Sequence, residues 1–444
     1  MTTDLPKSVG HVFYKKLNEL LAEAGFDRWV EDKCEAYYSS GKGRPGIAPG
    51  VYFRMLLVGY FEGIQSQRGI AWRCADSLSL RSFLGIPLTE STPDHSSLTV
   101  IRDRLPQEVH EAVFQWVLEL AGSKKLLGGK TVAVDSTTLE ANAAMKSIVR
   151  RDTGEDWREY VIGLMRRDGV IAADVTPSDD EIRSYDKNRK NKKVSNDEWV
   201  SRTDPHARIA RMKDGTTHLA YKAENVVDLE SNLIVAAEIY AADKADTATI
   251  EDSLHAAQSN LKEAGSETQI KEVAADKGYH STEVLGTLAE KTNYRTYIPE
   301  PKVPGGKRDW KKRSKLERKA VEANRRRMKR KKGKGLQRRR SEKVERTFAH
   351  VAETGGARRT WLRSDEKVRK RYSIATAAYN LGVLMRSLFK MGTARGLQGV
   401  GAGLGGFLAL YYLAWNATKT LPSFIRAEIR IFQTIGAAQR LMPC

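Results

Sequence analysis

Three acidic residues that lie far apart in the sequence each occupy a place where a strand or a helix could present a carboxylate to a metal ion. Asp135 follows the apolar run 131–134, and Asp276 follows the apolar run 273–275. Glu345 comes directly after the most basic stretch of the chain. A carboxylate at the edge of an apolar strand is costly unless it is paired or binds a metal. The three residues therefore indicate metal-assisted phosphodiester chemistry on nucleic acid.

Other polar residues compete for roles in the same chemistry. Asp243 and Asp246 also follow a predicted strand and are alternatives for the second ligand, although we expect both to cap the helix that comes next. Glu140 and Glu342 are expected to be solvated or to support the neighbouring acids. For His280, a contact with a metal-bound water or a phosphate and a plain structural hydrogen bond stay equally open.

The charge of the chain indicates a polyanionic partner. Lys and Arg number 75 against 55 Asp and Glu, which gives a net charge of +20, and nucleic acid fits this excess better than a membrane surface. The segment 302–340 alone carries about twenty basic residues. Its apolar residues recur at intervals compatible with a helix, so we expect an arm that contacts the DNA backbone rather than a solvated tail. The candidate DNA-binding residues at the end of this segment and just beyond it are Arg338, Arg339, Arg340 and Arg346.

The cysteines and the N-terminus indicate a cytoplasmic protein, which the basic charge leads us to expect in association with DNA. The three cysteines show no spacing typical of a zinc site or a disulfide framework. The first residues are polar and lack the apolar centre of a signal peptide. The uncharged segment 400–417 approaches the length of a membrane span, but its glycines favour a buried or partner-facing helix over a span.

The N-terminal part of the chain, residues 1–125, is predicted to be a helical domain. Its last helices follow an N-cap signal at residues 92–97 and present Arg102 and Arg104. Short helices that end in a basic helix are typical of a helix-turn-helix arrangement. Recognition of DNA ends and a structural or dimerisation role are both compatible with this pattern.

From residue 126 to residue 390 the pattern changes to a mixed α/β domain. A charged insertion at about 141–217 interrupts it, because this stretch is too long for a simple connection. Helices are expected at 341–353 and 365–390, and a helical tail at 391–444. The other predicted elements are strands at 131–134, 218–228, 233–240, 270–275 and 294–298, and helices at 247–264 and 282–291. A hairpin followed by crossover helices predicts a mixed sheet with flanking helices.

Three motifs in this order resemble those of bacterial insertion-sequence transposases with a DDE catalytic domain. They are Val134-Asp135-Ser136-Thr137, Ala275-Asp276-Lys277-Gly278-Tyr279 and Val344-Glu345-Arg346-Thr347-Phe348-Ala349-His350. The segments 44–104, 353–363 and 377–381 are also similar to parts of these enzymes, so the resemblance covers about residues 40–390. It implies an RNase H-like fold in which Asp135, Asp276 and Glu345 bind Mg²⁺ or Mn²⁺.

The resemblance also implies an activity and its partners. Water is expected to cleave the element end, and the freed 3′ hydroxyl then attacks target DNA. The expected partners are double-stranded DNA and further copies of the chain in a synaptic complex, with no small-molecule substrate. A metal-dependent nuclease of the same fold and an inactive DNA-binding derivative are the alternatives.

Two positions near the third motif depart from the family pattern. Many relatives carry Lys and Arg where this chain has Ala352 and Ser341, so the residue that contacts phosphate there is not assigned. Trp361 lies among arginines and could stack on a flipped or terminal base, although packing in the core is the favoured interpretation.

Overall fold

The computed structural model describes residues 10–39, 46–190, 195–212, 215–302, 310, 313–391 and 394. The chain divides into two compact units, Met1–Met391 and Gly392–Cys444. Nearly all of the predicted tail at 391–444, including the apolar segment 400–417, lies outside the described residues. Among the helices that the structure describes, none is both long and apolar enough to cross a membrane.

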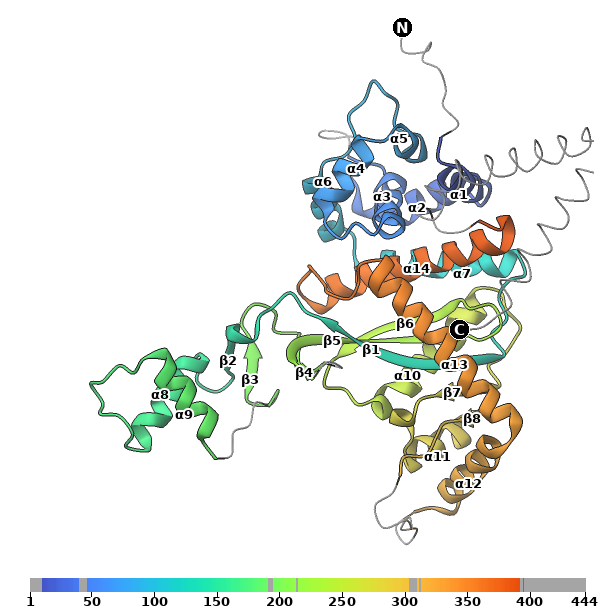
Figure 1. Ribbon diagram of the computed structural model, residues 1–444. Coiled ribbons are helices and arrows are strands. Elements are labelled where there is room, and N and C mark those ends of the chain that lie inside the picture. Colours follow the sequence, from blue (N-terminus) through green and yellow to red (C-terminus); the bar gives the residue numbers. More distant parts are fainter. Residues whose placement is uncertain are drawn as a thin grey trace, which may run out of the picture. The chain divides into compact units, whose positions relative to one another are not determined.

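The N-terminal region is helical, as predicted (Figure 1). Ser66 caps α4 by accepting a hydrogen bond from the Gly69 amide, and Asp94 caps α6 by accepting one from the Ser96 amide. These caps satisfy backbone donors that a helix leaves unpaired at its start. The helices are α1 (Val12–Glu23), α2 (Phe26–Cys34), α3 (Pro49–Glu62), α4 (Gln67–Ala75), α5 (Leu78–Leu84), α6 (His95–Arg104) and α7 (Gln107–Ser123).

A mixed sheet forms the centre of the following domain. Its strands are β1 (Thr131–Glu140), β4 (Arg208–Arg211), β5 (Thr217–Asp228), β6 (Ile234–Ala241), β7 (Glu272–Ala275) and β8 (Arg295–Tyr297). Both β4 and β6 pair with one edge of β5, and β5 is antiparallel to β1. On the other side, β7 is parallel to β1 and β8 is parallel to β7. The order β6-β5-β1-β7-β8, antiparallel and then parallel, is the RNase H-like arrangement, which confirms the predicted fold class.

Helices cover both faces of this sheet. Side chains alternate between the faces along a strand, so Val132 and Val134 pack into the core formed with α10 (Asp246–Glu263), α11 (Thr282–Lys291) and α12 (Lys315–Lys329). The opposite face lies against α13 (Lys331–Ala349) and α14 (Asp365–Phe389), and α14 also packs against α7 (Figure 1). Tyr372 of α14 donates a hydrogen bond to Asn225, which pairs with Asp135 across β5 and β1.

The charged insertion contains its own small elements (Figure 1). It consists of β2 (Ile148–Arg150), α8 (Trp157–Arg167), α9 (Asp179–Asn188) and β3 (Trp199–Ser201), followed by β4 of the main sheet. Val161, Met165 and Ile182 form its small apolar core. Asp156 and Ser178 begin the two helices with capping boxes. The insertion is therefore a folded subdomain rather than an extended connection.

Two elements are longer than predicted. The strand that was expected to end at residue 134 continues to Glu140, because β5 pairs with it along this whole length. Asp135 consequently lies within β1 rather than after it. The helix expected from residue 341 begins at Lys331. Gly333 allows this start, since a Cβ atom there would lie 2.4 Å from the Arg327 carbonyl oxygen.

Candidate active site

Asp135 and Asp276 lie on the same face of the sheet and share one cationic partner. Nη1 of Arg340 donates to Oδ2 of Asp135 over 2.6 Å, and its Nη2 lies 3.9 Å from Oδ1 of Asp276. The Arg340 residue is only 8% exposed. Because a single guanidinium reaches both carboxylates, the structure brings the first two predicted ligands into one small region that already holds positive charge.

Helix α13 fixes the position of Arg340. Gln337 accepts a hydrogen bond from Nε of Arg340 over 3.2 Å and donates to the carbonyl oxygen of Ala275, directly before Asp276. The same amide donates to the carbonyl oxygen of Tyr297. Residues at helical spacing form the buried side of α13: Gly333, Leu336, Arg340, Val344 and Thr347. The side of the helix that carries Arg340 therefore faces the sheet.

Glu345 lies on the same helix but outside this buried side. It is exposed, and five residues after Arg340 a helix has turned by about 140°. Within the part of the chain that the structure describes, no three His, Cys, Asp or Glu side chains gather as a metal-binding group. The structure thus places Asp135 and Asp276 together and does not place Glu345 with them.

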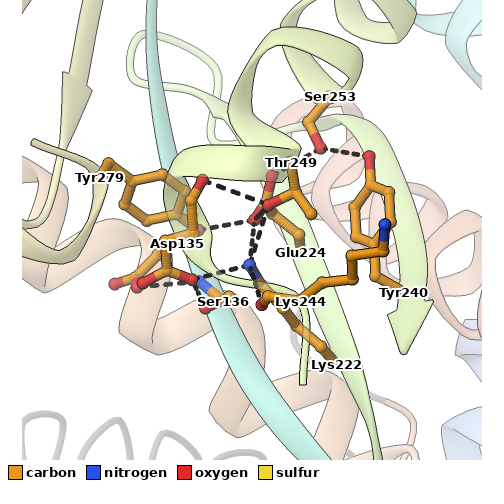
Figure 2. A network of polar contacts seen from close by, with 10 residues as sticks. Asp135, Ser136, Lys222, Glu224, Tyr240, Lys244, Thr249, Ser253 and Tyr279 are labelled. Carbon is orange, nitrogen blue, oxygen red and sulfur yellow. Dashed lines mark hydrogen bonds and ion pairs between the residues drawn. The ribbon is translucent and has the colours of Figure 1, made fainter. Parts of the chain in front are cut away.

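The opposite face of the sheet carries a polar network directly behind Asp135 (Figure 2). Ser136, the next residue, donates through its hydroxyl to Oδ1 of Asp246 over 3.0 Å. Nζ of Lys222 lies 2.7 Å from the same oxygen and 3.1 Å from Oε2 of Glu224. Lys222 is 6% exposed, so these two carboxylates compensate a buried positive charge.

Glu224 is the most buried carboxylate of this network, with no exposed surface. It accepts hydrogen bonds from the hydroxyl groups of Thr249, Ser253 and Tyr279, over 2.7, 2.6 and 2.9 Å (Figure 2). Burial, and then the negative charge of Glu224, raise the pKa of the Tyr279 phenol, which stays protonated and can donate. Tyr279 belongs to the segment after Asp276, so the network connects strand β5 to both candidate ligand segments.

Lys222 and Glu224 were not among the predicted site residues. Both lie at alternate positions of a strand, where charged residues usually indicate a solvated face. Val226, two residues after Glu224, lies on the same face of the strand and packs in the core with α10. The signal that could have revealed their burial is that they share alternate positions of the strand with Val226, an apolar residue expected on the core face.

The predicted DNA-binding arginines occupy different environments. Arg338 is exposed, and Arg346 is exposed beside Glu342 at 3.2 Å. Arg339 donates to the carbonyl oxygen of Leu229. Arg340 is occupied by the two aspartates, so in this state it presents no exposed guanidinium to DNA.

The two candidates in α6 are partly held by neighbours. Nε of Arg102 lies 3.5 Å from Asp103, and the exposed Arg104 guanidinium stacks 5.1 Å from the ring centre of Tyr38. Stacking of this kind leaves the guanidinium edge of Arg104 accessible.

The remaining candidates are also placed. Asp243 is exposed and lies 3.7 Å from Arg208, and Glu140 lies 3.5 Å from Arg359. His280 is buried, at 7% exposure. Trp361 is 50% exposed rather than packed in the core.

Comparison with known families gives this RNase H-like fold an identity. The family model described as "Transposase DDE domain" matches residues 128–381, and the model described as "Transposase domain (DUF772)" matches residues 5–104. The first match covers more than half of the chain, so the protein belongs to the family of transposases with a DDE domain. It is a DNA transposase of the insertion-sequence type, from a family of metal-dependent enzymes that cleave DNA and transfer strands.

Two further comparisons add little to this assignment. A search of curated proteins found no match. Among solved structures, the chain is similar to one titled "Crystal structure of the Mos1 mariner paired end complex with Mn", at 12% identity and a TM-score of 0.17. The match covers 79% of this chain and 99% of that chain. A TM-score of this size does not define a shared fold.

Proposed function

We propose that Asp135, Asp276 and Glu345 are the catalytic carboxylates of this transposase and that Mg²⁺ or Mn²⁺ binds between them. The observation that carries the proposal is the shared contact of Asp135 and Asp276 with the Arg340 guanidinium. Two carboxylates that converge on one cation supply the oxygen donors that these hard divalent ions prefer. When bound, such an ion activates the attacking oxygen and stabilises the leaving oxygen of a phosphodiester.

Glu345 completes the proposed set only if α13 adjusts. The helix is followed by a π-helical segment, His350–Thr354, and such segments change the register of a helix and are frequent at functional sites. A bound metal ion would compete with Arg340 for the two aspartates, and a local rearrangement near the C-terminal end of α13 would bring Glu345 towards them.

The proposed partner is double-stranded DNA, both the element ends and the target. Arg338 and Arg346 on α13 and Arg104 on α6 present exposed positive charge for the backbone. Joining of two element ends to a target requires that both ends be held together, so we propose that further copies of the chain assemble on DNA.

Strand cleavage of element-end DNA tests the proposal. We expect Mg²⁺-dependent nicking by the wild-type protein, no nicking in EDTA, and loss of nicking with retained DNA binding in Asp135→Asn and Asp276→Asn. Asp243→Asn, which changes an exposed carboxylate near the same sheet edge, is the matched control. Unchanged nicking in either site variant would refute the assignment.

The same assay separates the alternatives. Nicking without joined products would indicate a nuclease. Tight binding that never leads to nicking, with or without Mg²⁺, would indicate an inactive DNA-binding derivative.

A further inference from the structure

One carboxylate connects the segments that carry the two candidate ligands. Oδ1 of Asp246 accepts the hydroxyl of Ser136, the residue after Asp135, over 3.0 Å. Its Oδ2 lies against Gly278, two residues after Asp276, where a Cβ atom would come within 2.5 Å of it. Asp246 therefore touches both segments just beyond the two aspartates.

The backbone pairing of β1 and β7 stops just before the two aspartates. The register of β1 and β7 ends with the pair Val134 and Ala275, one residue before Asp135 and Asp276. Two carboxylates at this point repel each other. Beyond the last backbone pair, side chains join the two segments: Arg340 reaches both aspartates on one face of the sheet, and Asp246 contacts both segments on the other face.

Asp246 is itself firmly held. It is the first residue of α10, where the partial positive charge of a helix N-terminus favours an acid. Nζ of Lys222 lies 2.7 Å from its carboxylate and also donates to Thr249 over 2.8 Å. Glu224 fixes the other side of the Lys222 ammonium group.

We propose that Asp246 is a positioning residue that sets the separation of Asp135 and Asp276, and that Lys222 holds it in place. This inference rests on the proposed role of the two aspartates in metal binding. Asp246 is not a further ligand, because Ser136 points to the α10 face of the sheet and Asp135 points to the α13 face. It acts through the backbone segments that it joins.

Mn²⁺ affinity of the full-length protein tests this inference without any measurement of activity. The signal of free Mn²⁺ in electron paramagnetic resonance gives the dissociation constant. We expect Asp246→Asn to weaken binding at least tenfold, and the matched variant Asp243→Asn to leave it unchanged. Ser136→Ala, which removes one link without changing any charge, is expected to weaken binding in the same direction.

Gly278 offers a second and independent test. Gly278→Ala keeps every carboxylate but displaces the side chain of Asp246, so it is expected to weaken Mn²⁺ binding as Asp246→Asn does. In an Asp246→Ala background no carboxylate lies against position 278, so Gly278→Ala should not weaken Mn²⁺ binding any further. Strong coupling between the two changes is the expected result of this double-mutant cycle.

The outcomes distinguish a failure of this inference from a failure of the proposed function. If Asp135→Asn abolishes Mn²⁺ binding while Asp246→Asn and Gly278→Ala bind as the wild type does, the positioning role is refuted and the metal site stands. Additive effects in the cycle would also refute it. If Asp135→Asn leaves Mn²⁺ binding unchanged, the metal site itself is refuted and the positioning role with it.

Discussion

Removal of the Arg340 guanidinium is expected to destabilise the metal-free protein. Arg340→Gln keeps a long polar side chain but removes the charge between Asp135 and Asp276. The 2.6 Å contact with Asp135 is a charge-assisted hydrogen bond, which contributes about 1.5–3 kcal/mol. The 3.9 Å contact reaches a half-exposed carboxylate and adds at most about 1 kcal/mol. In EDTA the variant should therefore lose about 1.5–4 kcal/mol of unfolding free energy.

The same change is expected to strengthen metal binding. Arg340 and a divalent cation compete for the same two carboxylates. The free energy by which Arg340 stabilises the metal-free protein therefore lowers the affinity for the metal. Each 1.4 kcal/mol of competition that is removed corresponds to about a tenfold gain in affinity. Arg340→Gln should bind Mn²⁺ at least about tenfold more tightly than the wild type.

Two measurements on the same samples test this prediction. Urea unfolding in EDTA and in Mn²⁺ gives the stability, and a Mn²⁺ titration gives the affinity. Arg338→Gln, which removes an exposed arginine from the same helix, is the control and should match the wild type in both. If Arg340→Gln is as stable as the control in EDTA and binds Mn²⁺ no more tightly, Arg340 neither stabilises the metal-free protein nor competes with the metal ion.

Three further predictions concern stability and DNA binding. Burial lowers the pKa of His110 to about 4, so the unfolded chain binds a proton more readily than the folded one. The free energy of unfolding should therefore fall as the pH drops from about 6.5 to about 4. Urea unfolding across this range should show a weaker pH dependence for His110→Gln than for the wild type. Leu254→Ala removes a side chain that is 1% exposed in the core beneath the sheet and should cost about 2–5 kcal/mol in urea unfolding; a cost near zero would contradict the packing. Arg338→Gln should reduce the slope of log affinity against log salt by about one for element-end DNA, and an unchanged slope would remove Arg338 from the interface.

Local signals in the sequence predicted several elements closely. The helix expected at 282–291 is α11 with the same bounds, because the capping residue Ser281 and the apolar spacing that define it lie within or next to the helix. The two aspartates were found for a similar reason, since each directly follows an apolar run in the sequence. Their common partner was not found, because Arg340 lies in a basic run in which every arginine looks solvated until the sheet shows which side of α13 is buried.

Long-range pairing explains what the sequence did not predict. The extension of β1 to Glu140 depends on β5, which pairs with it from about eighty residues further along the chain. The buried pair of Lys222 and Glu224 depends on α10, which covers that face and supplies hydroxyl donors. Neither partner is visible from the strand alone.

Glu345 is exposed and lies apart from Asp135 and Asp276 in this structure, yet we propose that it joins them in catalysis. The decisive experiment is Mg²⁺-dependent cleavage of element-end DNA by Glu345→Gln, compared with Glu342→Gln on the same helix. We predict that Glu345→Gln binds the DNA but loses nicking, whereas Glu342→Gln nicks as the wild type does. Nicking by Glu345→Gln at the wild-type rate would show that Glu345 is not a catalytic residue.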